Sequence, residues 1–418
     1  MAKKAEIEQT EIESPYELPD GWKWERASNF ADIFTGNSIN ENVKKEKYTG
    51  ITEGLNFIGT KDVDFDGTIN YENGVKISDY ENFKTVPSNT PLLCIEGGSA
   101  GKKLGITSEQ VCFGNKLCAF VCKNVESKLV YYYLQTNAFF YSFMKERHGL
   151  IGGVTVGTLK NIPFPLPPTV AEQQRIVNRI ETMFEKLDQA QEKAQSVLGS
   201  FETRKAAILH KAFTGELTAN WRKENGVADE SWEEKRFDEV ADIKSNLVDV
   251  AEYQDFPHIA PDNIEKKTGV LLEYHTVAED KVKSGKHRFY AGQILYSKIR
   301  PYLSKVVVVD FDGVCSADMY PIEAKGDTRF LWYQMLSNEF LDRASNSGSR
   351  SVLPKINQKE LSVIPMRTCS LPEQQEIVRI LDTILKKETR AKEAAQTVLE
   401  QIALLKKSIL ARAFRGEL

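Results

Sequence analysis

The chain has 418 residues, more than one ordinary hydrophobic core supports, and this length predicts two to four domains. Its hydrophobic content of 41% and charged content of 27% are typical of a globular protein. No run approaches the ~18 apolar residues of a membrane helix. The net charge of −4 excludes a protein that coats nucleic acid through its overall charge, whereas a local basic surface stays open.

Residues 1–20 are charged and lack the apolar centre of a signal peptide, so we expect a solvated N-terminal tail and a cytoplasmic protein. The six cysteines form no C-x-x-C pair and have no histidine at metal-binding spacing. They are therefore predicted to be reduced, buried, structural thiols.

Two globular domains are predicted at residues 21–165 and 232–366. A linker at 218–231 is expected just before the second domain. Alternating β-branched and aromatic residues broken by Gly and Asn indicate mixed α/β domains with several strands. The domains share landmarks, such as WERASNFADIFTGNS with WEEKRFDEVADIKSN and YYLQTN with WYQMLSN. Elsewhere they differ, which indicates one scaffold that presents two different binding surfaces.

A long helix is predicted after each domain, at residues 166–217 and 367–418. Aligned without a gap, residues 171–217 and 372–418 share 21 of 47 positions, so the two segments are a duplication. A proline-rich stretch precedes each copy, and a glycine close to the end of each is a natural helix stop. Apolar residues between them recur at 3-4 spacing, which is typical of a coiled coil.

One charge interrupts the apolar seam of each helix, and the two charges are opposite. If the helices pair antiparallel so that residue numbers sum to 592, Arg204 faces Glu388 and Leu187 faces Leu405. We expect this spacer-helix pairing to fix the register of an intramolecular antiparallel coiled coil with pseudo-two-fold symmetry. In the alternative, each helix packs on its own domain and both charges are solvated.

Basic clusters mark the candidate DNA contacts. Residues 281–305 contain seven Lys or Arg and no acid, with three tyrosines interleaved, and residues 343–359 contain four more. Such stretches suit phosphate contacts together with side chains that reach base edges. An ordinary solvated face is the alternative. The candidate DNA-binding residues are Lys102, Lys103, Asn115, Lys116, Arg147, His148 and Lys160 in the first domain and Lys286, Arg288, Lys298, Arg300, Tyr302, Lys305, Arg343, Arg350 and Lys355 in the second.

The arrangement resembles the specificity (S) subunit of type I restriction-modification systems. The resemblance rests on PLPPTVAEQQRIV and LPEQQEIV at the helix starts, AFTGELTANWRKENG and AFRGEL at the helix ends, and the strand motif GQILYSKIRPYLSKV. It implies that each globular part is a target recognition domain for one half of a split double-stranded DNA sequence. It also implies a helical spacer that docks two adenine methyltransferase subunits, with restriction/translocase subunits in the complete enzyme. S-adenosylmethionine, ATP and Mg are then expected on partner subunits and no cofactor on this chain.

Three motifs with catalytic associations are set aside. NIPF at 161–164 is similar to the N-P-P-F signature of amino-methyltransferases, but Ile162 replaces its first proline and no Gly-rich loop precedes it. GGSAGKK lacks the spacing of a phosphate-binding loop. Asp262 followed by Glu279 and Lys281 nominally fits a metal-dependent nuclease, yet the pattern is degenerate in a chain this charged. We therefore predict a non-catalytic chain without a metal site.

The resulting hypothesis is a DNA sequence-recognition subunit for a bipartite, asymmetric site. Antiparallel helices would place the two domains head to tail, so that both approach one face of a duplex about one helical turn, roughly 34 Å, apart. The methyltransferase partners would flip the target adenine out of the base stack. Two rivals stay open: a self-contained nuclease or methyltransferase that uses the motifs above, and a coiled-coil adaptor without a role in DNA binding.

Overall fold

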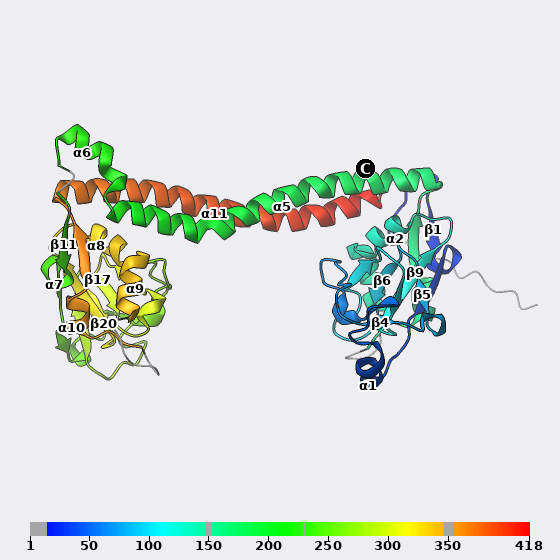
Figure 1. Ribbon diagram of the computed structural model, residues 1–418, viewed down its shortest axis with the longest axis horizontal. Helices are drawn as coiled ribbons and strands as arrows, with labels where there is room; N and C mark the ends of the chain where they lie inside the picture. The colour runs from blue at the N-terminus through cyan, green and yellow to red at the C-terminus, as the bar shows by residue number, and fades with distance from the viewer. Residues whose placement is uncertain (1–14, 148–151, 229–230, 347–353) are drawn as a thin grey trace, which may run out of the picture. The chain divides into compact units, whose positions relative to one another are not determined.

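The computed structural model describes residues 15–147, 152–228, 231–346 and 354–418 (Figure 1). It divides into two compact units. The first unit comprises the chain up to Ala194 together with Thr397–Leu418, and the second comprises Gln195–Gln396. Each unit contains one globular domain and a part of each long helix, so that α5 (Val170–Phe213) and α11 (Leu371–Ala413) both run through the two units.

The domain of the first unit is built on three small sheets. An antiparallel pair joins β1 to β10, and two four-stranded sheets have the orders β2-β9-β6-β7 and β4-β3-β8-β5, with β3 and β8 parallel. The strands are β1 (Lys23–Arg26), β2 (Ala31–Thr35), β3 (Leu55–Ile58), β4 (Lys76–Ile77), β5 (Thr85–Val86), β6 (Pro91–Cys94), β7 (Leu104–Ile106), β8 (Val111–Phe113), β9 (Leu117–Cys122) and β10 (Pro163–Leu166). The helices are α1 (Glu41–Val43), α2 (Ser127–Leu134), α3 (Asn137–Lys145) and α4 (Val156–Asn161).

The domain of the second unit also has three sheets. The antiparallel pair is β11 with β21, and the larger sheets have the orders β12-β20-β17-β18 and β13-β16-β19-β14-β15, with β14 and β19 parallel. The strands are β11 (Glu233–Arg236), β12 (Ala241–Ile243), β13 (Leu247–Val248), β14 (Pro257–Ile259), β15 (His275–Thr276), β16 (Lys286–Phe289), β17 (Ile294–Ser297), β18 (Val306–Val308), β19 (Gly313–Cys315), β20 (Met319–Ala324) and β21 (Pro365–Thr368). The helices are α6 (Ala219–Asn225), α7 (Phe237–Val240), α8 (Thr328–Met335), α9 (Asn338–Asn346) and α10 (Gln358–Ser362).

The two domains therefore follow one topology. The sheet β2-β9-β6-β7 corresponds to β12-β20-β17-β18, and the parallel pair β3–β8 corresponds to β14–β19. A fifth strand in the last sheet distinguishes the second domain. The predicted fold class, two mixed α/β domains each followed by a long helix, is confirmed.

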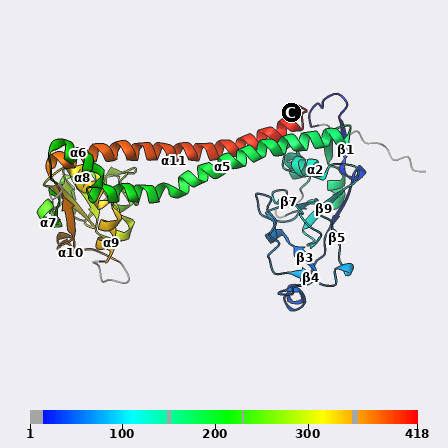
Figure 2. The same cartoon turned by 45° about the horizontal axis from the view of Figure 1, so that its top comes forward.

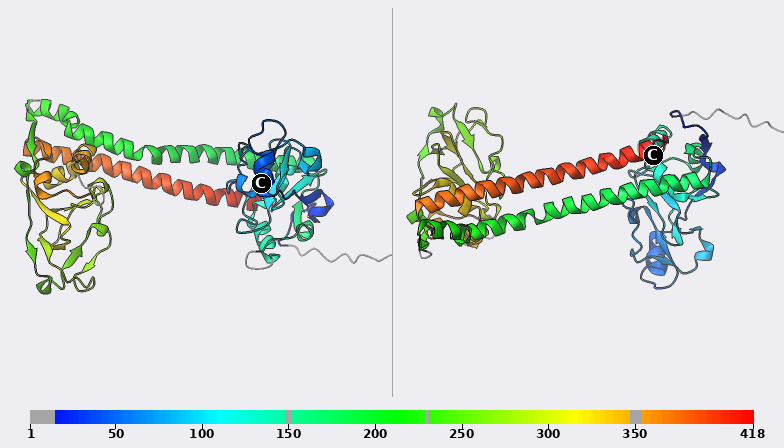
Figure 3. Two further views of the ribbon diagram at one scale, coloured as in Figure 1. Left: turned by 60° about the horizontal axis from the view of Figure 1, so that its bottom comes forward. Right: turned by 90° about the horizontal axis from the view of Figure 1, so that it is seen from above.

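The two long helices lie side by side and antiparallel within each unit (Figures 2 and 3). In the first unit Ile176 and Ile180 near the start of α5 share one buried core with Leu410 and Phe414 at the end of the chain. The Phe414 ring lies 5.1 Å from the ring of Tyr133 in α2. The start of α5 and the end of α11 thus both pack on the core of the first domain. This excludes the alternative in which each long helix packs only on its own domain.

The second unit repeats this arrangement with the helices exchanged. Leu209 and Phe213 at the end of α5 join Ile377 and Leu381 near the start of α11 in the core beneath α8. Truncating a buried residue of this size to Ala costs about 2–5 kcal/mol, so the helices contribute to the stability of each domain.

Both helices end at the expected glycines. Gly215 and Gly416 adopt the left-handed backbone conformation, with φ of +83° and +72°. Glycine takes up this conformation without the clash that a Cβ atom causes, and it commonly terminates helices. Along the described ranges of the chain, no helix is both long and apolar enough to cross a membrane.

Ion pairs join the helices within each unit. In the second unit Arg204 Nε donates to Glu388 Oε2 at 2.8 Å, so the two seam charges face each other. In the first unit Lys406 Nζ contacts Asp188 Oδ1 at 2.5 Å, whereas Leu405, drawn opposite Leu187 by the predicted register, is 48% exposed. The Arg204–Glu388 contact thus agrees with the predicted register in the second unit.

Residues 218–228, which belong to the segment 218–231 expected as a linker, fold against the start of α11. Glu373 is fully buried, and its Oε1 accepts hydrogen bonds from Arg222 Nη1 at 2.7 Å, Thr218 Oγ1 at 2.7 Å and Trp232 Nε1 at 3.0 Å. Arg222 lies on α6 and is itself buried. Because a buried carboxylate requires partners, this network holds α6 in place as a short helix.

All six cysteines are free thiols, five buried and Cys122 half-buried. Burial raises the pKa of Cys118 in the first domain and of Cys315 in the second to about 12 each. Such thiols are inert at neutral pH, as expected for structural residues.

Candidate nucleic-acid interface

The two basic segments of the second domain lie against each other. Ile299 and Lys355 form a β-bridge, Arg300 N–H donates to Pro354 O at 2.8 Å, and Ile356 N–H donates to Lys298 O at 2.9 Å. The structure therefore gathers Lys298, Arg300 and Lys355 beyond the end of β17. Lys355 is 55 positions from Arg300 in the sequence, so folding is what brings it to the other two residues.

The carboxylate of Asp318 partly neutralises the positive charge of this cluster. Lys355 Nζ lies 2.8 Å from Asp318 Oδ1, while Lys298 Nζ lies over the Tyr320 ring, 5.1 Å from its centroid. Burial, and then the nearby Lys355 charge, lower the pKa of Lys298. A phosphate would relieve this repulsion between lysines, so the cluster is chemically suited to an anion.

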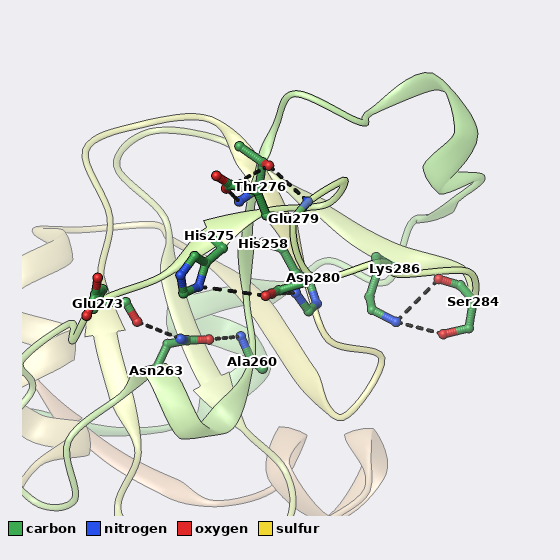
Figure 4. Close-up of polar contacts among 10 residues, drawn as sticks. All are labelled: His258, Ala260, Asn263, Glu273, His275, Thr276, Glu279, Asp280, Ser284 and Lys286. Carbon is green, nitrogen blue, oxygen red and sulfur yellow. Dashed lines mark hydrogen bonds and ion pairs between the residues drawn. The ribbon is translucent and has the colours of Figure 1, made fainter.

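Lys286 and Arg288 on β16 are engaged within the domain. Lys286 is buried, and its Nζ donates to Ser284 Oγ at 2.7 Å (Figure 4). Burial lowers the pKa of Lys286. Arg288 Nη1 donates to Tyr253 OH at 3.0 Å, and its guanidinium lies 5.0 Å from the Tyr290 ring centroid. Because Lys286 Nζ and Arg288 Nη1 already have partners within the domain, and Arg288 Nε is buried, both residues are weaker candidates for DNA contact than the exposed cations.

A short turn presents two exposed candidates. Arg300 and Tyr302 lie at the 3₁₀ helix η9 (Pro301–Leu303), with Arg300 exposed and Tyr302 47% exposed. Lys305 follows the turn, and its Nζ donates to Pro261 O at 2.7 Å and contacts Asp262 Oδ1 at 3.3 Å. Arg300 and Tyr302 are thus available to a ligand, while Lys305 fastens the turn to the next segment.

The remaining candidates of this domain fall outside this cluster. Arg343 on α9 is exposed and donates through Nη1 to Pro365 O at 2.5 Å. Arg350 lies outside the described residues.

In the first domain the candidates lie on neighbouring turns. Lys102 is exposed in the turn between β6 and β7, and Asn115 and Lys116 are exposed in the turn between β8 and β9. The two turns are joined by a hydrogen bond from Ile95 N–H to Lys116 O at 3.0 Å. Lys160 is exposed on α4.

Arg147 and Lys103 hold these turns together. Arg147 Nε donates to Gly152 O at 2.9 Å and its Nη2 to Gly97 O at 3.5 Å. Lys103 Nζ donates to Thr60 O at 3.1 Å, in the manner of Lys305 in the second domain. His148 lies outside the described residues. Arg147 and Lys103 thus stabilise the loops of this surface through hydrogen bonds to backbone carbonyls.

Sequence reasoning missed an exposed aromatic residue at this surface. Phe65 is 69% exposed, and Lys103 Nζ lies 5.1 Å from its ring centroid. An exposed aromatic ring beside a cation offers a stacking surface. The available signal was the position of Phe65 between two aspartates in the turn DFDGT.

The residues of the nuclease-like pattern are engaged in local contacts. Glu279 accepts hydrogen bonds from Thr276 N–H at 2.8 Å and Thr276 Oγ1 at 2.9 Å (Figure 4), and these bonds lower its pKa. Asp280 faces His258 Nδ1 at 2.7 Å and His275 Nδ1 at 3.7 Å. Across the residues that the structure describes, no group of three or more His, Cys, Asp and Glu could hold a metal ion.

The NIPF motif serves the core. Ile162 and Phe164 are buried, and Phe164 in β10 packs 4.7 Å from the Tyr133 ring and 5.4 Å from the Phe30 ring. Since a base-gripping motif must reach an open pocket, this placement favours the structural interpretation.

The chain is similar in sequence to specificity subunits of type I restriction enzymes. The chain is 41% identical over 293 residues to the type I restriction enzyme EcoDI specificity subunit of Escherichia coli, covering 65% of this chain and 66% of that one. It is 43% identical over 67 residues to the Escherichia coli EcoBI specificity subunit, covering 16% and 14%. The aligned part thus spans just under two thirds of the EcoDI subunit.

Two solved structures share the fold. A chain from a study of complex assembly and conformational transition of the type I R-M system matches with a TM-score of 0.73 and 16% identity, covering 97% of this chain and all of that one. The HsdS subunit from Thermoanaerobacter tengcongensis matches with a TM-score of 0.65 and 18% identity, covering 98% and 100%.

The family model described as type I restriction modification DNA specificity domain matches residues 19–197 and 229–401, once for each half of the chain. The family expected from the sequence is thereby confirmed: this chain belongs to the type I restriction modification DNA specificity domain family.

Proposed function

We propose that this chain is the DNA sequence-recognition subunit of a type I restriction-modification complex and that it reads a bipartite, asymmetric site. The observation that carries this proposal is the pair of domains with one topology and different exposed turns. Lys102, Asn115 and Lys116 occupy the turns of the first domain, and Arg300 and Tyr302 that of the second. Two related scaffolds with different side chains suit two different half-sites.

DNA contact is supported by the chemistry of these surfaces. Exposed lysines suit phosphates, and Arg and Asn side chains suit base edges in the major groove. The Lys298–Lys355 cluster suits a phosphate, since one nearby carboxylate, that of Asp318, faces two cations. Binding through phosphates releases counterions, so affinity is expected to fall steeply with salt.

The long helices are the proposed docking surface for two methyltransferase subunits. Val398, Leu404 and Leu405 of α11 are 37%, 66% and 48% exposed. Leucines that stay exposed on a helix already paired with another helix favour docking of a protein partner. Restriction/translocase subunits would join the full complex, and S-adenosylmethionine, ATP and Mg would bind to the partners, with no cofactor on this chain. The site of action is the cytoplasm.

The decisive experiment is a map of methyladenine in the host genome with and without this chain. A split motif that disappears on deletion and returns with the wild-type chain supports the proposal. A self-contained enzyme would instead methylate or cleave DNA as the purified chain alone. Methylation that persists unchanged on deletion overturns the proposal.

Charge-reversal variants separate DNA recognition from an adaptor role. Lys102→Glu and Arg300→Glu are each expected to weaken DNA binding by the methyltransferase complex, and Lys102→Glu is expected to reduce the slope of affinity against salt by about 1. Lys223→Glu on α6 is the matched control, because Lys223 is exposed and lies outside the candidate interface. Equal binding by all three variants would favour the adaptor.

A further inference from the structure

The turn that carries Arg300 occurs in both domains. In the first domain the turn follows β6, and Ala100 N–H donates to Gly97 O at 3.2 Å to close it. In the second domain the turn follows β17, and Leu303 N–H donates to Arg300 O at 2.9 Å to close it. Ile95 lies two positions before Gly97, and its N–H donates to Lys116 O. Lys298 lies two positions before Arg300, and its N–H donates to Asp318 O. Arg300 therefore occupies the position of Gly97.

Both turns use the left-handed backbone conformation twice, at positions four residues apart. In the first domain these positions are Gly97 and Gly101, with φ of +80° and +74°. In the second domain they are Arg300 and Ser304, with φ of +48° and +45°. The shared turn requires this conformation, which glycine adopts freely and which is strained for residues with a Cβ atom.

Arg300 and Ser304 differ in what their side chains do. Ser304 is 3% exposed and its Oγ has no hydrogen-bond partner, so it presents nothing to a ligand. Arg300 is exposed, and within the described ranges its guanidinium has no hydrogen-bond or ion-pair partner. An arginine at a strained glycine position without a structural contact is explained by a function of its side chain.

We propose that Arg300 is a specificity-determining residue of the second domain and that its guanidinium reads a guanine in one half of the DNA site. A guanidinium can donate two parallel hydrogen bonds to O6 and N7 of guanine in the major groove. The backbone bond from Arg300 N–H to Pro354 O fixes the base of the side chain, and the exposed Tyr302 flanks it. Since the first domain has glycine at this position, its half-site is read by other residues. This inference rests on the proposed function.

The test is a methyladenine map of cells that express the methyltransferase subunits with this chain or with Arg300→Gly, Arg300→Lys or Ser304→Gly. Arg300→Gly is expected to relax one guanine position in one half of the motif, with discrimination reduced about 5- to 100-fold, and to leave the other half intact. Arg300→Lys keeps the charge but replaces the planar, parallel donors with one flexible ammonium group, so it should relax the same position less than Arg300→Gly does. Ser304→Gly relieves the second strained residue and should keep the motif.

Thermal unfolding separates recognition from support of the fold. Arg300→Gly should melt at the wild-type temperature or about 2–4 °C above it, because glycine relieves the left-handed backbone. A lower melting temperature would make Arg300 a structural residue and overturn the inference, as would an unchanged motif in Arg300→Gly. A wild-type chain that directs no split motif would refute the proposed function instead.

Discussion

The buried ion pair between Arg222 and Glu373 allows a quantitative prediction. The Arg222 side chain is 7% exposed and that of Glu373 is fully buried, with 2.7 Å between Nη1 and Oε1. Replacing Arg222 with Ala leaves a buried carboxylate with two neutral donors, Thr218 and Trp232, and one oxygen, Oε2, without any partner. Removing one partner of such a pair costs about 3–5 kcal/mol, so we expect Arg222→Ala to destabilise the second unit by that amount.

The duplication supplies a matched control. Glu172 is the counterpart of Glu373, but it is only half-buried, with a side chain 31% exposed, and it pairs at 2.7 Å with Arg175, which is 49% exposed. Arg175 also donates to Leu418 O at 3.1 Å. An exposed pair of this kind contributes about 0–1 kcal/mol, so Arg175→Ala should change stability little.

The assay is denaturant unfolding followed by tryptophan fluorescence, to which Trp232 contributes from within the network. We expect Arg222→Ala to shift the unfolding midpoint strongly and Arg175→Ala to shift it weakly. The double variant Arg222→Ala with Glu373→Ala should recover part of the loss, because it removes both buried charges. Equal effects of Arg222→Ala and Arg175→Ala, or a fully additive double variant, would refute the reasoning.

Three further predictions concern the helices and the thiols. Arg204→Leu and Glu388→Leu should each lower the free energy of unfolding by about 1 kcal/mol, whereas the double variant should unfold thermally at or above the wild-type temperature; additive losses would contradict this. Burial raises the pKa of Cys118 and Cys315 from 9.0 to about 12, so the thiols lose their protons in the unfolded state before they do so in the folded state. The contribution of the two protonated thiols to the free energy of unfolding is complete below pH 9 and should be lost as the pH rises towards 12. Denaturant midpoints across that range measure it, and Cys118→Ala should reduce the slope. Leu404→Ser should weaken methyltransferase binding about tenfold or more in calorimetric titration without changing the melting temperature, and unchanged affinity would count against docking on α11.

The sequence alone determined the repeated architecture. Apolar spacing, prolines before each helix and the final glycines predicted α5 and α11, because periodicity and helix-stop residues are local properties of the chain. The duplicated Glu-Gln-Gln and Gly-Glu-Leu segments predicted two domains of one kind. The opposite charges at Arg204 and Glu388 could also be matched, since a helix places residues at regular intervals.

Only the tertiary structure decided what each basic residue does. Lys286, Lys103 and Arg147 belong to the same kind of basic sequence as the exposed Lys102. Yet Lys286 is buried, Lys103 donates to the carbonyl of Thr60, and Arg147 donates to the carbonyls of Gly152 and Gly97. Composition gives the charge of a side chain but not the neighbours that folding brings to it. The left-handed backbone of Arg300 shows the same limit, because Arg300 lies in a turn and its N–H group donates to Pro354 O, far along the chain.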